Sequence, residues 1–291
     1  MRPLAFLQLR RYTFFKLIWV LCKTVFELKN RDTFHFIKLG VVLMSKNIKE
    51  SVCSLVIEGN IGAGKSTFLK ILKDYLQIQP IFEPHEQWQM IGTENLLKKF
   101  YEDTERWAYT FQSYAFVTRV REQERAMAQF PNATYVIERS VYSDRYCFAK
   151  NCFELGKMSL LEWNLYQEWF GWLVENYTVK PTGFIYLRTN PNVCYQRLVK
   201  RNRNEEFGIS LQYLESLHKK HEEWLVERIN PEKHLENIPV LVLESNKEFE
   251  ADKDEQISHI EKIVDYFNLR INNNAPTHNI KSSKKEFFGS L

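Results

Sequence analysis

The sequence contains few cysteines, and their positions indicate neither a disulfide framework nor a zinc site. Five cysteines occur among 291 residues, an odd number, and no two of them form a C-x-x-C pair. They are Cys22, Cys53, Cys147, Cys152 and Cys194. Four of the five fall in segments whose pattern predicts strand or helix, where cysteine usually serves as a small buried apolar residue. We therefore expect a protein of a reducing compartment.

The sequence also lacks a long apolar run, an internal repeat and a low-complexity block. The apolar stretch 17–22 is bounded by Lys16 and Lys23, so it is too short to cross a bilayer. Hydrophobic residues make up 44% of the chain and charged residues 26%, as in ordinary folded domains. The length suits one large α/β domain with extensions, whose core needs no structural metal, and we expect no membrane partner.

The positive charge of the chain is concentrated at its beginning. The formal net charge is +4, but residues 1–43 carry eight Lys and Arg against only Glu27 and Asp32. That segment is therefore +6, and the rest of the chain is −2. A slightly acidic body lacks the electrostatic footprint of a nucleic-acid-binding protein, so we expect no nucleic-acid partner.

A glycine-rich motif follows the first strand-like run. The pattern G-x-x-x-x-G-K-[ST] is matched by Gly59, Asn60, Ile61, Gly62, Ala63, Gly64, Lys65, Ser66 and Thr67. An apolar run precedes it and a helical pattern follows, which is the strand–loop–helix context of a P-loop. In such a loop the backbone N–H groups and the helix N-terminus bind phosphate oxygens, a lysine adds charge and a hydroxyl serves magnesium. The motif therefore predicts binding of a nucleotide phosphate tail.

Strand-like and helical segments alternate after residue 51, which predicts a parallel sheet covered by helices. The expected strands are Val52–Ile57, Pro80–Phe82, Thr134–Glu138, Gly183–Arg188 and Val240–Glu244. Between the second and third strands we expect two long helices, with the clearest helical spacing over 105–130. A further helix over 160–176 contains Trp163, Trp169 and Trp172, which suit a core or a subunit interface.

Charged residues follow two of these strands and one helix. Glu83 comes directly after the second strand, and Glu138-Arg139 end the third, at the sheet edge where α/β folds assemble ligand sites. A carboxylate there can serve as a base, and an acid–guanidinium pair can serve a metal and a phosphate, although a solvated strand end or a surface ion-pair cluster fits the same spacing. The basic segment 197–203 is either a solvated face or a lid over phosphates.

Taken together, five motifs closely resemble the deoxyribonucleoside kinases, most of all the deoxycytidine and deoxyguanosine kinase branch. They are E-G-N-I-G-A-G-K-S-T, E-P-x-x-x-W, R-W-x-x-x-F-Q-x-Y-A, E-R-S-V-Y-S-D-R-Y and R-N-R-N-E-E. The resemblance covers about residues 50–270 in the order of the family. It implies an α/β P-loop kinase fold with a five-stranded parallel sheet flanked by helices and an arginine-rich lid.

The resemblance also implies roles for individual residues in phosphate transfer. Glu83 looks like the general base that takes the proton of the substrate 5′-hydroxyl, and Arg139 resembles the arginine that steadies this base and the phosphoryl group. Lys65 acts on the donor phosphates, while Ser66 and Glu138 match the magnesium-associated pair. Arg197, Arg201 and Arg203 correspond to arginines of the lid. The implied cofactors are ATP as donor and Mg²⁺.

Further matches concern the nucleoside. Tyr101 and Glu206 match residues that hold the 3′-hydroxyl, and Gln112 matches an amide that reads the base. Arg119 with Asp144 resembles a charged pair near the exocyclic edge of the base. Trp88, Phe111 and Phe148 are expected to enclose the ring. The small Ala115 between Gln112 and Arg119 is similar to the cytosine and purine branch, so deoxycytidine, deoxyadenosine and deoxyguanosine are favoured over thymidine.

The expected activity is transfer of the γ-phosphate of ATP to the 5′-hydroxyl of a small-molecule deoxyribonucleoside in nucleotide salvage. One alternative is a nucleoside monophosphate kinase, which shares a P-loop and a basic lid but needs a cationic subsite for the acceptor phosphate. Another is a non-catalytic protein that senses ATP, which the combination of Glu83, Arg139 and the basic segment disfavours. A homodimer is implied by the family resemblance.

The two ends of the chain fall outside the expected kinase domain, residues 44–270. Residues 1–43 are basic and have no acidic residue before Glu27, as in a mitochondrial transit peptide, but they are poor in serine. A secretory segment or a dispensable extension ahead of a start at Met44 are the alternatives. We expect an intracellular enzyme, cytoplasmic or mitochondrial. Residues 271–291 are expected to form a mobile polar tail.

Overall fold

The computed structural model of the protein describes residues 53–272 and 275–276. The interpretations of residues 1–43 and of a start at Met44 therefore concern segments outside the described residues. The same holds for most of the expected tail, namely 273–274 and 277–291.

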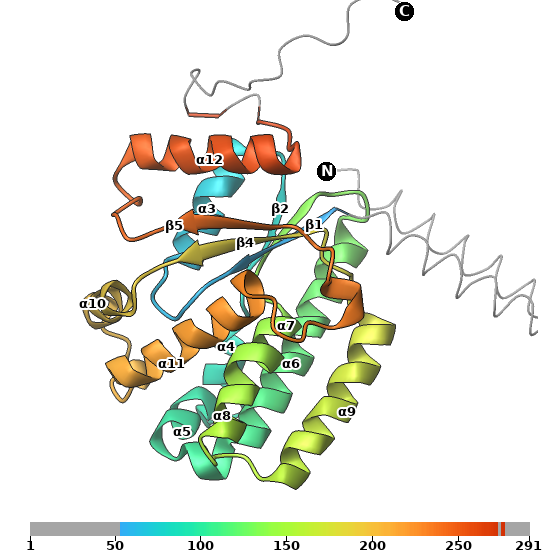
Figure 1. Cartoon of the computed structure of the whole chain (residues 1–291), viewed down its shortest axis with the longest axis vertical. Coiled ribbons are helices and arrows are strands. Elements are labelled where there is room, and N and C mark those ends of the chain that lie inside the picture. The colour runs from blue at the N-terminus through green and yellow to red at the C-terminus, as the bar shows by residue number, and fades with distance from the viewer. Residues whose placement is uncertain (1–52, 273–274, 277–291) are drawn as a thin grey trace, which may run out of the picture. The chain divides into compact units, whose positions relative to one another are not determined.

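Five parallel strands form a single sheet, as the sequence predicts (Figure 1). Its order is β2-β3-β1-β4-β5, so β1 lies at the centre between β3 and β4. The strands are β1 (Ser54–Glu58), β2 (Gln79–Ile81), β3 (Tyr135–Glu138), β4 (Gly183–Arg188) and β5 (Val240–Glu244). Each differs from its expected range by no more than two residues at either end. Because all strands run in one direction, their carboxyl ends meet at one edge.

Helices cover the connections between the strands. The α-helices are α3 (Lys65–Tyr75), α4 (His85–Gln89), α5 (Leu96–Glu102), α6 (Thr104–Gln129), α7 (Val141–Ser143), α8 (Lys150–Glu154), α9 (Leu160–Tyr177), α10 (Pro191–Arg201), α11 (Leu211–His221) and α12 (Lys253–Phe267). Shorter turns of other helix types are η1 (Asp144–Ala149), η2 (Asn204–Glu206), η3 (Glu222–Val226) and η4 (Lys233–Leu235).

The prediction of two long helices between β2 and β3 is wrong: one long helix, α6, follows two short ones, α4 and α5. Polar caps explain the breaks. The side chain of Asn95 accepts a hydrogen bond from the Lys98 N–H and starts α5, and the side chain of Asp103 accepts one from the Arg106 N–H and starts α6. Gly92, at φ 62°, lies in the turn that separates α4 from α5.

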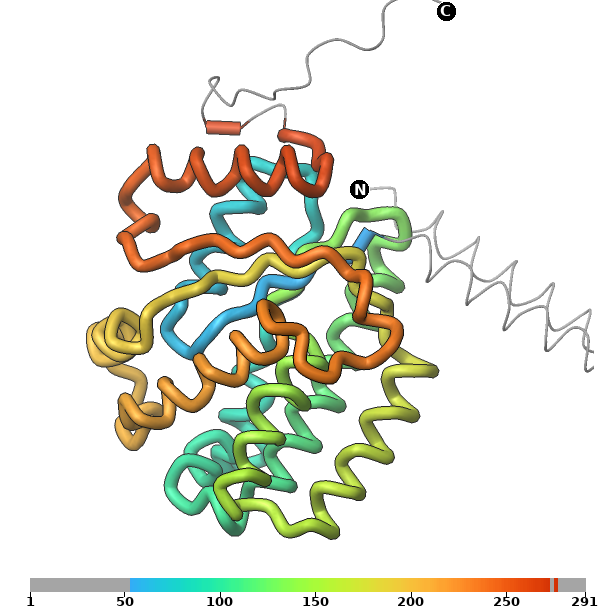
Figure 2. Tube along the Cα trace, in the orientation of Figure 1, coloured from blue at the N-terminus to red at the C-terminus, as the bar shows by residue number. Residues whose placement is uncertain are grey.

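The sheet carries an apolar layer on each face. Leu55 and Ile57 of β1 belong to the core cluster that includes residues of α3 and α12, whereas Val56 between them belongs to the cluster that includes residues of α6 and α9. The ribbon and tube views show the same arrangement, with α3 and α12 on one side of the sheet and α6, α8 and α9 on the other (Figure 1, Figure 2). This double cover explains why the strands are apolar on both faces.

A third apolar cluster lies away from the sheet, between α4, α5, α6, α8 and α9. It includes Trp88, Phe100 and Phe111. The ring centroid of Phe111 lies 5.6 Å from that of Trp88 and 4.6 Å from that of Phe100. The short helices α4 and α5 are thus packed onto α6 rather than onto the sheet. This packing creates a second wall opposite the carboxyl edge of the strands.

Candidate active site

The phosphate loop occupies the turn between β1 and α3. Gly62 has φ 80°, and a Cβ atom there would lie 2.4 Å from the backbone oxygen of Cys194, so only glycine fits. Asn60 anchors the loop, because its side-chain amide donates to the Leu214 carbonyl oxygen at 2.7 Å. The loop is therefore held in its conformation by contacts from other elements.

Lys65, the first residue of α3, points its Nζ atom back at the loop and donates to the Asn60 carbonyl oxygen at 2.8 Å. Burial, with the neighbouring Arg139 charge as the second cause, lowers the pKa of Lys65 to about 7. A buried ammonium beside another cation is stabilised by an anion. The loop, the helix N-terminus and Lys65 together suit a phosphate chain.

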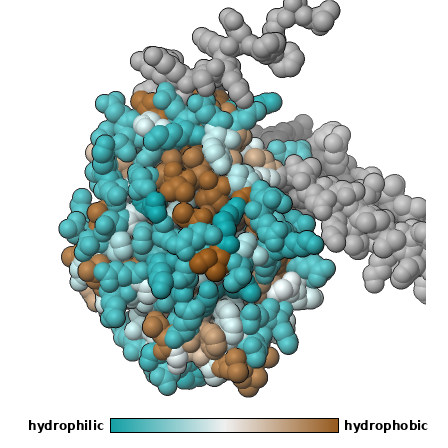
Figure 3. Space-filling model, in the orientation of Figure 1, coloured by the Kyte–Doolittle hydropathy of each residue, from teal (hydrophilic) through white to brown (hydrophobic). Residues whose placement is uncertain are grey.

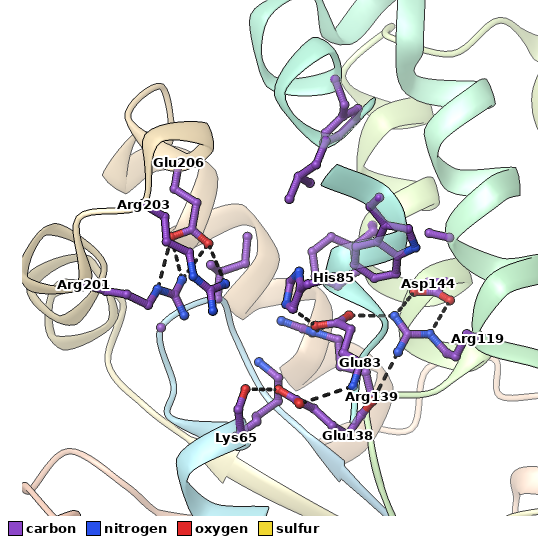
Figure 4. Close-up of a pocket in the computed structure, with 18 of the residues that line it drawn as sticks. Lys65, Glu83, His85, Arg119, Glu138, Arg139, Asp144, Arg201, Arg203 and Glu206 are labelled. Carbon is purple, nitrogen blue, oxygen red and sulfur yellow. Dashed lines mark hydrogen bonds and ion pairs between the residues drawn. The ribbon is translucent and has the colours of Figure 1, made fainter. Parts of the chain in front are cut away.

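A cavity of about 230 Å³ opens beside the loop at the carboxyl edge of the sheet (Figure 4). Of the expected site residues, those that line it are Ile61, Gly62, Gly64, Lys65, Ser66, Thr67, Glu83, Trp88, Tyr101, Phe111, Gln112, Arg119, Glu138, Arg139, Asp144, Phe148, Arg201, Arg203 and Glu206. Those that do not are Gly59, Asn60, Ala63 and Arg197. Residues separated by more than a hundred positions in sequence thus surround one space.

Glu83 lies in the wall of this cavity, two residues after the end of β2. Its side chain is only 7% exposed. Its Oε1 accepts a hydrogen bond from Arg119 Nη2 at 2.7 Å and lies 3.5 Å from Arg139 Nε, and its Oε2 lies 3.1 Å from His85 Nε2. Burial alone would raise the pKa of Glu83, but the His85, Arg119 and Arg139 neighbours outweigh it and hold the pKa well below its usual range. The carboxylate is thus kept ionised.

Arg119 joins Glu83 to Asp144. Its guanidinium donates to Asp144 Oδ2 at 2.8 Å and Oδ1 at 3.1 Å, and also to the backbone oxygen of Glu138 at 3.2 Å. The Arg119–Asp144 pair expected near a base is present, and its further bond to Glu83 is an addition that the sequence did not predict. The positive charge of Arg119 is shared between two carboxylates.

Arg139 has a backbone conformation that is unusual for a residue other than glycine, with φ 60°. Its guanidinium lies 4.6 Å from the centroid of the Phe148 ring and is almost fully buried, while its Nη1 atom has no hydrogen-bond partner. A buried guanidinium N–H without a partner is costly unless a ligand accepts from it. An oxygen of a phosphoryl group fits that donor.

Ser66 and Glu138 face each other where α3 and β3 meet the cavity. The Ser66 hydroxyl donates to Glu138 Oε1 at 2.5 Å, and Glu138 Oε2 lies 3.4 Å from the backbone N–H of Glu83. No group of three or more His, Cys, Asp or Glu suited to a metal occurs in the described part of the chain. One hydroxyl and one carboxylate suit Mg²⁺, which takes its remaining oxygens from phosphates and water.

The opposite wall of the cavity is aromatic. The Trp88 indole N–H donates to Thr118 Oγ1 at 2.8 Å and its ring meets Phe111 edge-on. Gln112 is 1% exposed, lines the cavity, and its side-chain NH₂ group has no partner. A flat ring with polar edge groups would fit between these aromatic side chains and use the free amide.

The expected lid arginines divide between two cavities. Nη2 of Arg201 donates to both carboxylate oxygens of Glu206 at 2.7 Å. Nη1 of Arg203 lies 3.6 Å from Glu206 Oε1. Arg197 instead donates to the backbone oxygens of Ala63 and Lys247, and lines a neighbouring cavity of about 340 Å³. That cavity borders the other side of the phosphate loop and also contains Phe249. We expected three arginines on one site, and the structure brings only two of them to the main cavity.

The far end of the main cavity holds Tyr101 beside Glu206. Burial, followed by the Glu206 charge, raises the pKa of the Tyr101 phenol, so that it remains a neutral donor. A neutral hydroxyl beside a carboxylate that retains free acceptor capacity can bind a sugar hydroxyl, which both donates and accepts.

Two functional candidates were missed from the sequence. His85 contacts Glu83, and its only sequence signal is its position two residues after that carboxylate. Glu58 is the last residue of β1 and is completely buried; a carboxylate that ends an apolar strand directly before Gly59 was the available signal. The Ser140 hydroxyl donates to Glu58 Oε1 at 2.6 Å, and the other oxygen has no partner.

A P-loop at the end of the central strand, with a carboxylate and two guanidiniums around a nucleoside-sized cavity, defines the class of P-loop phosphotransferases. The comparison with known proteins identifies the family within this class. Residues 55–267 match the family model for deoxynucleoside kinase, so the chain belongs to the deoxynucleoside kinase family.

Curated relatives agree with the family assignment. Deoxycytidine kinase 2 of Gallus gallus is 41% identical, over 77% of this chain and 93% of that protein. Deoxycytidine kinase of Homo sapiens is 39% identical, over 72% and 89% of the two chains. The mitochondrial deoxyguanosine kinase of Xenopus laevis is 38% identical, over 71% and 86%. Our chain is therefore a deoxynucleoside kinase that uses ATP as phosphate donor. The described helices include none that is long and apolar enough to cross a membrane.

Replacing Glu58 by Gln should stabilise the protein in a pH-dependent manner. Burial raises the pKa of Glu58 to about 7 against the opposing effects of Arg139 and the Ser140 and Ser143 hydroxyls. The folded state thus binds a proton more tightly than the unfolded state, and this contribution to stability is lost as pH rises through 7. Glutamine cannot ionise, so its advantage over the wild type should grow from about 1 kcal/mol at pH 5 to about 3 kcal/mol at pH 8. Urea unfolding at both pH values measures it, and a pH-independent difference would contradict the assignment.

Proposed function

We propose that this kinase transfers the γ-phosphate of ATP, bound as its magnesium complex, to the 5′-hydroxyl of a deoxyribonucleoside in nucleotide salvage. Deoxycytidine, deoxyadenosine and deoxyguanosine are the favoured acceptors. The observation that carries the proposal is that the ionised Glu83 and the Lys65 loop line the same cavity. A hydroxyl placed between them has a proton acceptor on one side and a phosphate on the other.

Backbone N–H groups of residues 59–67 and the Lys65 ammonium would hold the donor phosphates, and Arg197 of α10 would act from the neighbouring cavity. Ser66 and Glu138 would hold Mg²⁺, which neutralises phosphate charge when bound. The free Nη1 of Arg139 would donate to an equatorial oxygen of the moving phosphoryl group. Arg201 and Arg203 would act as lid residues from the opposite side, which adds positive charge and excludes water.

At the acceptor end, Glu83 would take the proton of the 5′-hydroxyl as the oxygen attacks phosphorus. Arg119 holds the carboxylate in place, because its Nη2 donates to Glu83 Oε1 while Asp144 fixes its other edge. This pairing also disfavours a nucleoside monophosphate as acceptor. The Arg119 guanidinium, which adjoins Glu83, is already paired with two carboxylates, so it offers little to an acceptor phosphate.

The nucleoside would lie between Trp88, Phe111 and Phe148, with its 3′-hydroxyl at Tyr101 and Glu206. The free amide of Gln112 would bind the base edge, and Arg119 with Asp144 would lie near the exocyclic group. Ala115 leaves space beside them. The names of the relatives, deoxycytidine kinase and deoxyguanosine kinase, support the choice of cytosine and purine bases.

The kinase domain is proposed to span residues 44–270, which the family match over 55–267 supports. Residues 1–43 would then be a transit peptide or a dispensable extension, and residues 271–291 a tail. The enzyme is proposed to work in the cytoplasm or in mitochondria. A mitochondrial deoxyguanosine kinase among the relatives supports the second compartment, and sequencing the N-terminus of the natural protein distinguishes the two.

We also propose a homodimer that forms through α9. The large apolar residues Leu161, Leu165, Trp169 and Trp172 share one face of this helix by their spacing, and all are substantially exposed, with Trp169 at 53% and Trp172 at 50%. The surface view shows apolar side chains gathered near the beginning of the helix (Figure 3). An apolar face of this kind is typical of a subunit interface, and a second copy of the chain would cover it.

A panel of the four common deoxynucleosides with ATP and Mg²⁺ tests the substrate class. We expect phosphorylation of deoxycytidine and of the two purine deoxynucleosides, with kcat/KM for thymidine lower by at least about tenfold, because the small Ala115 together with the Arg119–Asp144 pair resembles the cytosine and purine branch. Chromatographic detection of the 5′-monophosphates gives the rates. Absence of transfer to any of the four nucleosides would refute the proposed activity.

Replacing Glu83 by Gln tests the proposed base. Glutamine preserves the shape but cannot take the proton, so kcat should fall by about 10²–10⁴-fold, the usual contribution of a general base. Nucleoside binding, measured by calorimetry, should remain. A variant with wild-type kcat would show that Glu83 is not the base, even if the enzyme phosphorylates nucleosides.

Replacing Trp169 by Glu tests the interface. A charge in the centre of the apolar face should prevent association, so that light scattering reports half the mass of the wild type. Replacing the neighbouring Glu168 by Gln serves as the control. Equal masses for the Trp169→Glu variant and the wild type would contradict a dimer through α9.

A further inference from the structure

Among the described residues, His85 is the one titratable side chain in contact with Glu83 that the proposed reaction leaves without a role. It is the first residue of α4, directly after Pro84, and its side chain is 29% exposed. Its ring lines the main cavity and packs edge-on against Trp88 at a centroid distance of 5.1 Å. The backbone N–H of His85 donates to the Glu83 carbonyl oxygen at 2.9 Å, so the two residues are tied through both backbone and side chain.

The two oxygens of Glu83 have different partners. Oε1 is held by the guanidinium of Arg119 and approached by that of Arg139, whereas Oε2 lies 3.1 Å from Nε2 of His85. Without His85, the two arginines would hold the carboxylate at one oxygen only, and it could rotate about its terminal bond. A base that must meet a hydroxyl proton within hydrogen-bond distance loses efficiency when its orientation is not fixed.

We propose that His85 is a positioning residue of the kinase reaction: its Nε2–H donates to Glu83 Oε2 and sets the plane of the carboxylate. The inference rests on the proposed role of Glu83 as base. Nδ1 of His85 is buried and has no partner among the described residues, so Nε2 is the ring atom through which His85 contacts the base.

Replacing His85 by Val and by Gln separates the effect of losing the hydrogen-bond donor from the effect of losing the imidazole ring. Val removes the donor, and we expect kcat to fall about tenfold, the loss that corresponds to one hydrogen bond to a charged group, while KM for the nucleoside changes less than about twofold. Gln can place an N–H group near Oε2 and so can replace the donor. The His85→Gln variant should keep kcat within about threefold of wild type at pH 8.

His218→Gln is the matched control, because His218 is 27% exposed and also faces a glutamate, Glu222, at 4.0 Å, but does not line the cavity. It should retain the wild-type kcat and KM. Thermal unfolding and nucleoside binding confirm that each variant is folded. The role of His85 is refuted if both of its variants match wild type, or if both lose kcat equally at pH 8. The role of Glu83 then stands, provided that Glu83→Gln is inactive. An active Glu83→Gln enzyme refutes both.

Discussion

The ion network in which Arg119 joins Glu83 to Asp144 is the interaction on which the site depends. Its three members come from the end of β2, the middle of α6 and the start of η1, and all are nearly buried. Removing one partner would leave an uncompensated charge in a region of low dielectric, which is strongly unfavourable. The same contacts that fix α6 against the sheet therefore also keep the carboxylate of Glu83 ionised and in place.

The parallel sheet explains why the groups of opposite charge meet at one edge. β1 ends at the phosphate loop, β3 ends at Glu138 and Arg139, and β2 ends just before Glu83. Because β3 lies between β1 and β2, the acidic and basic groups of its carboxyl end face both neighbours. The order of strands thus places Glu138 between the phosphate loop and Glu83, although Glu138 and Glu83 are far apart in sequence.

The segment η2 connects the two walls of the cavity. Arg201 and Arg203 contact Glu206, while the neighbouring Glu205 accepts hydrogen bonds from Gln89 at 3.1 Å and Asn95 at 3.0 Å, on the opposite wall. Residues 201–206 therefore form an arginine–carboxylate cluster on one side and, through Glu205, contact α4 and the start of α5 on the other. These part-buried hydrogen bonds connect the two walls of the cavity.

The sequence alone determined the phosphate loop, the five strands and the charged residues at their ends, because these features are local: backbone conformation and hydrophobic period are encoded by neighbouring residues. It did not determine the division of residues 82–134 into three helices, the bond from Arg119 to Glu83, the contact of His85 with that carboxylate, or the placement of Arg197 in a separate cavity. These depend on how α4 and α6 pack against the sheet and on where α10 ends. Side chains tens of residues apart meet at distances of a few ångströms only after that packing, so no local pattern specifies them.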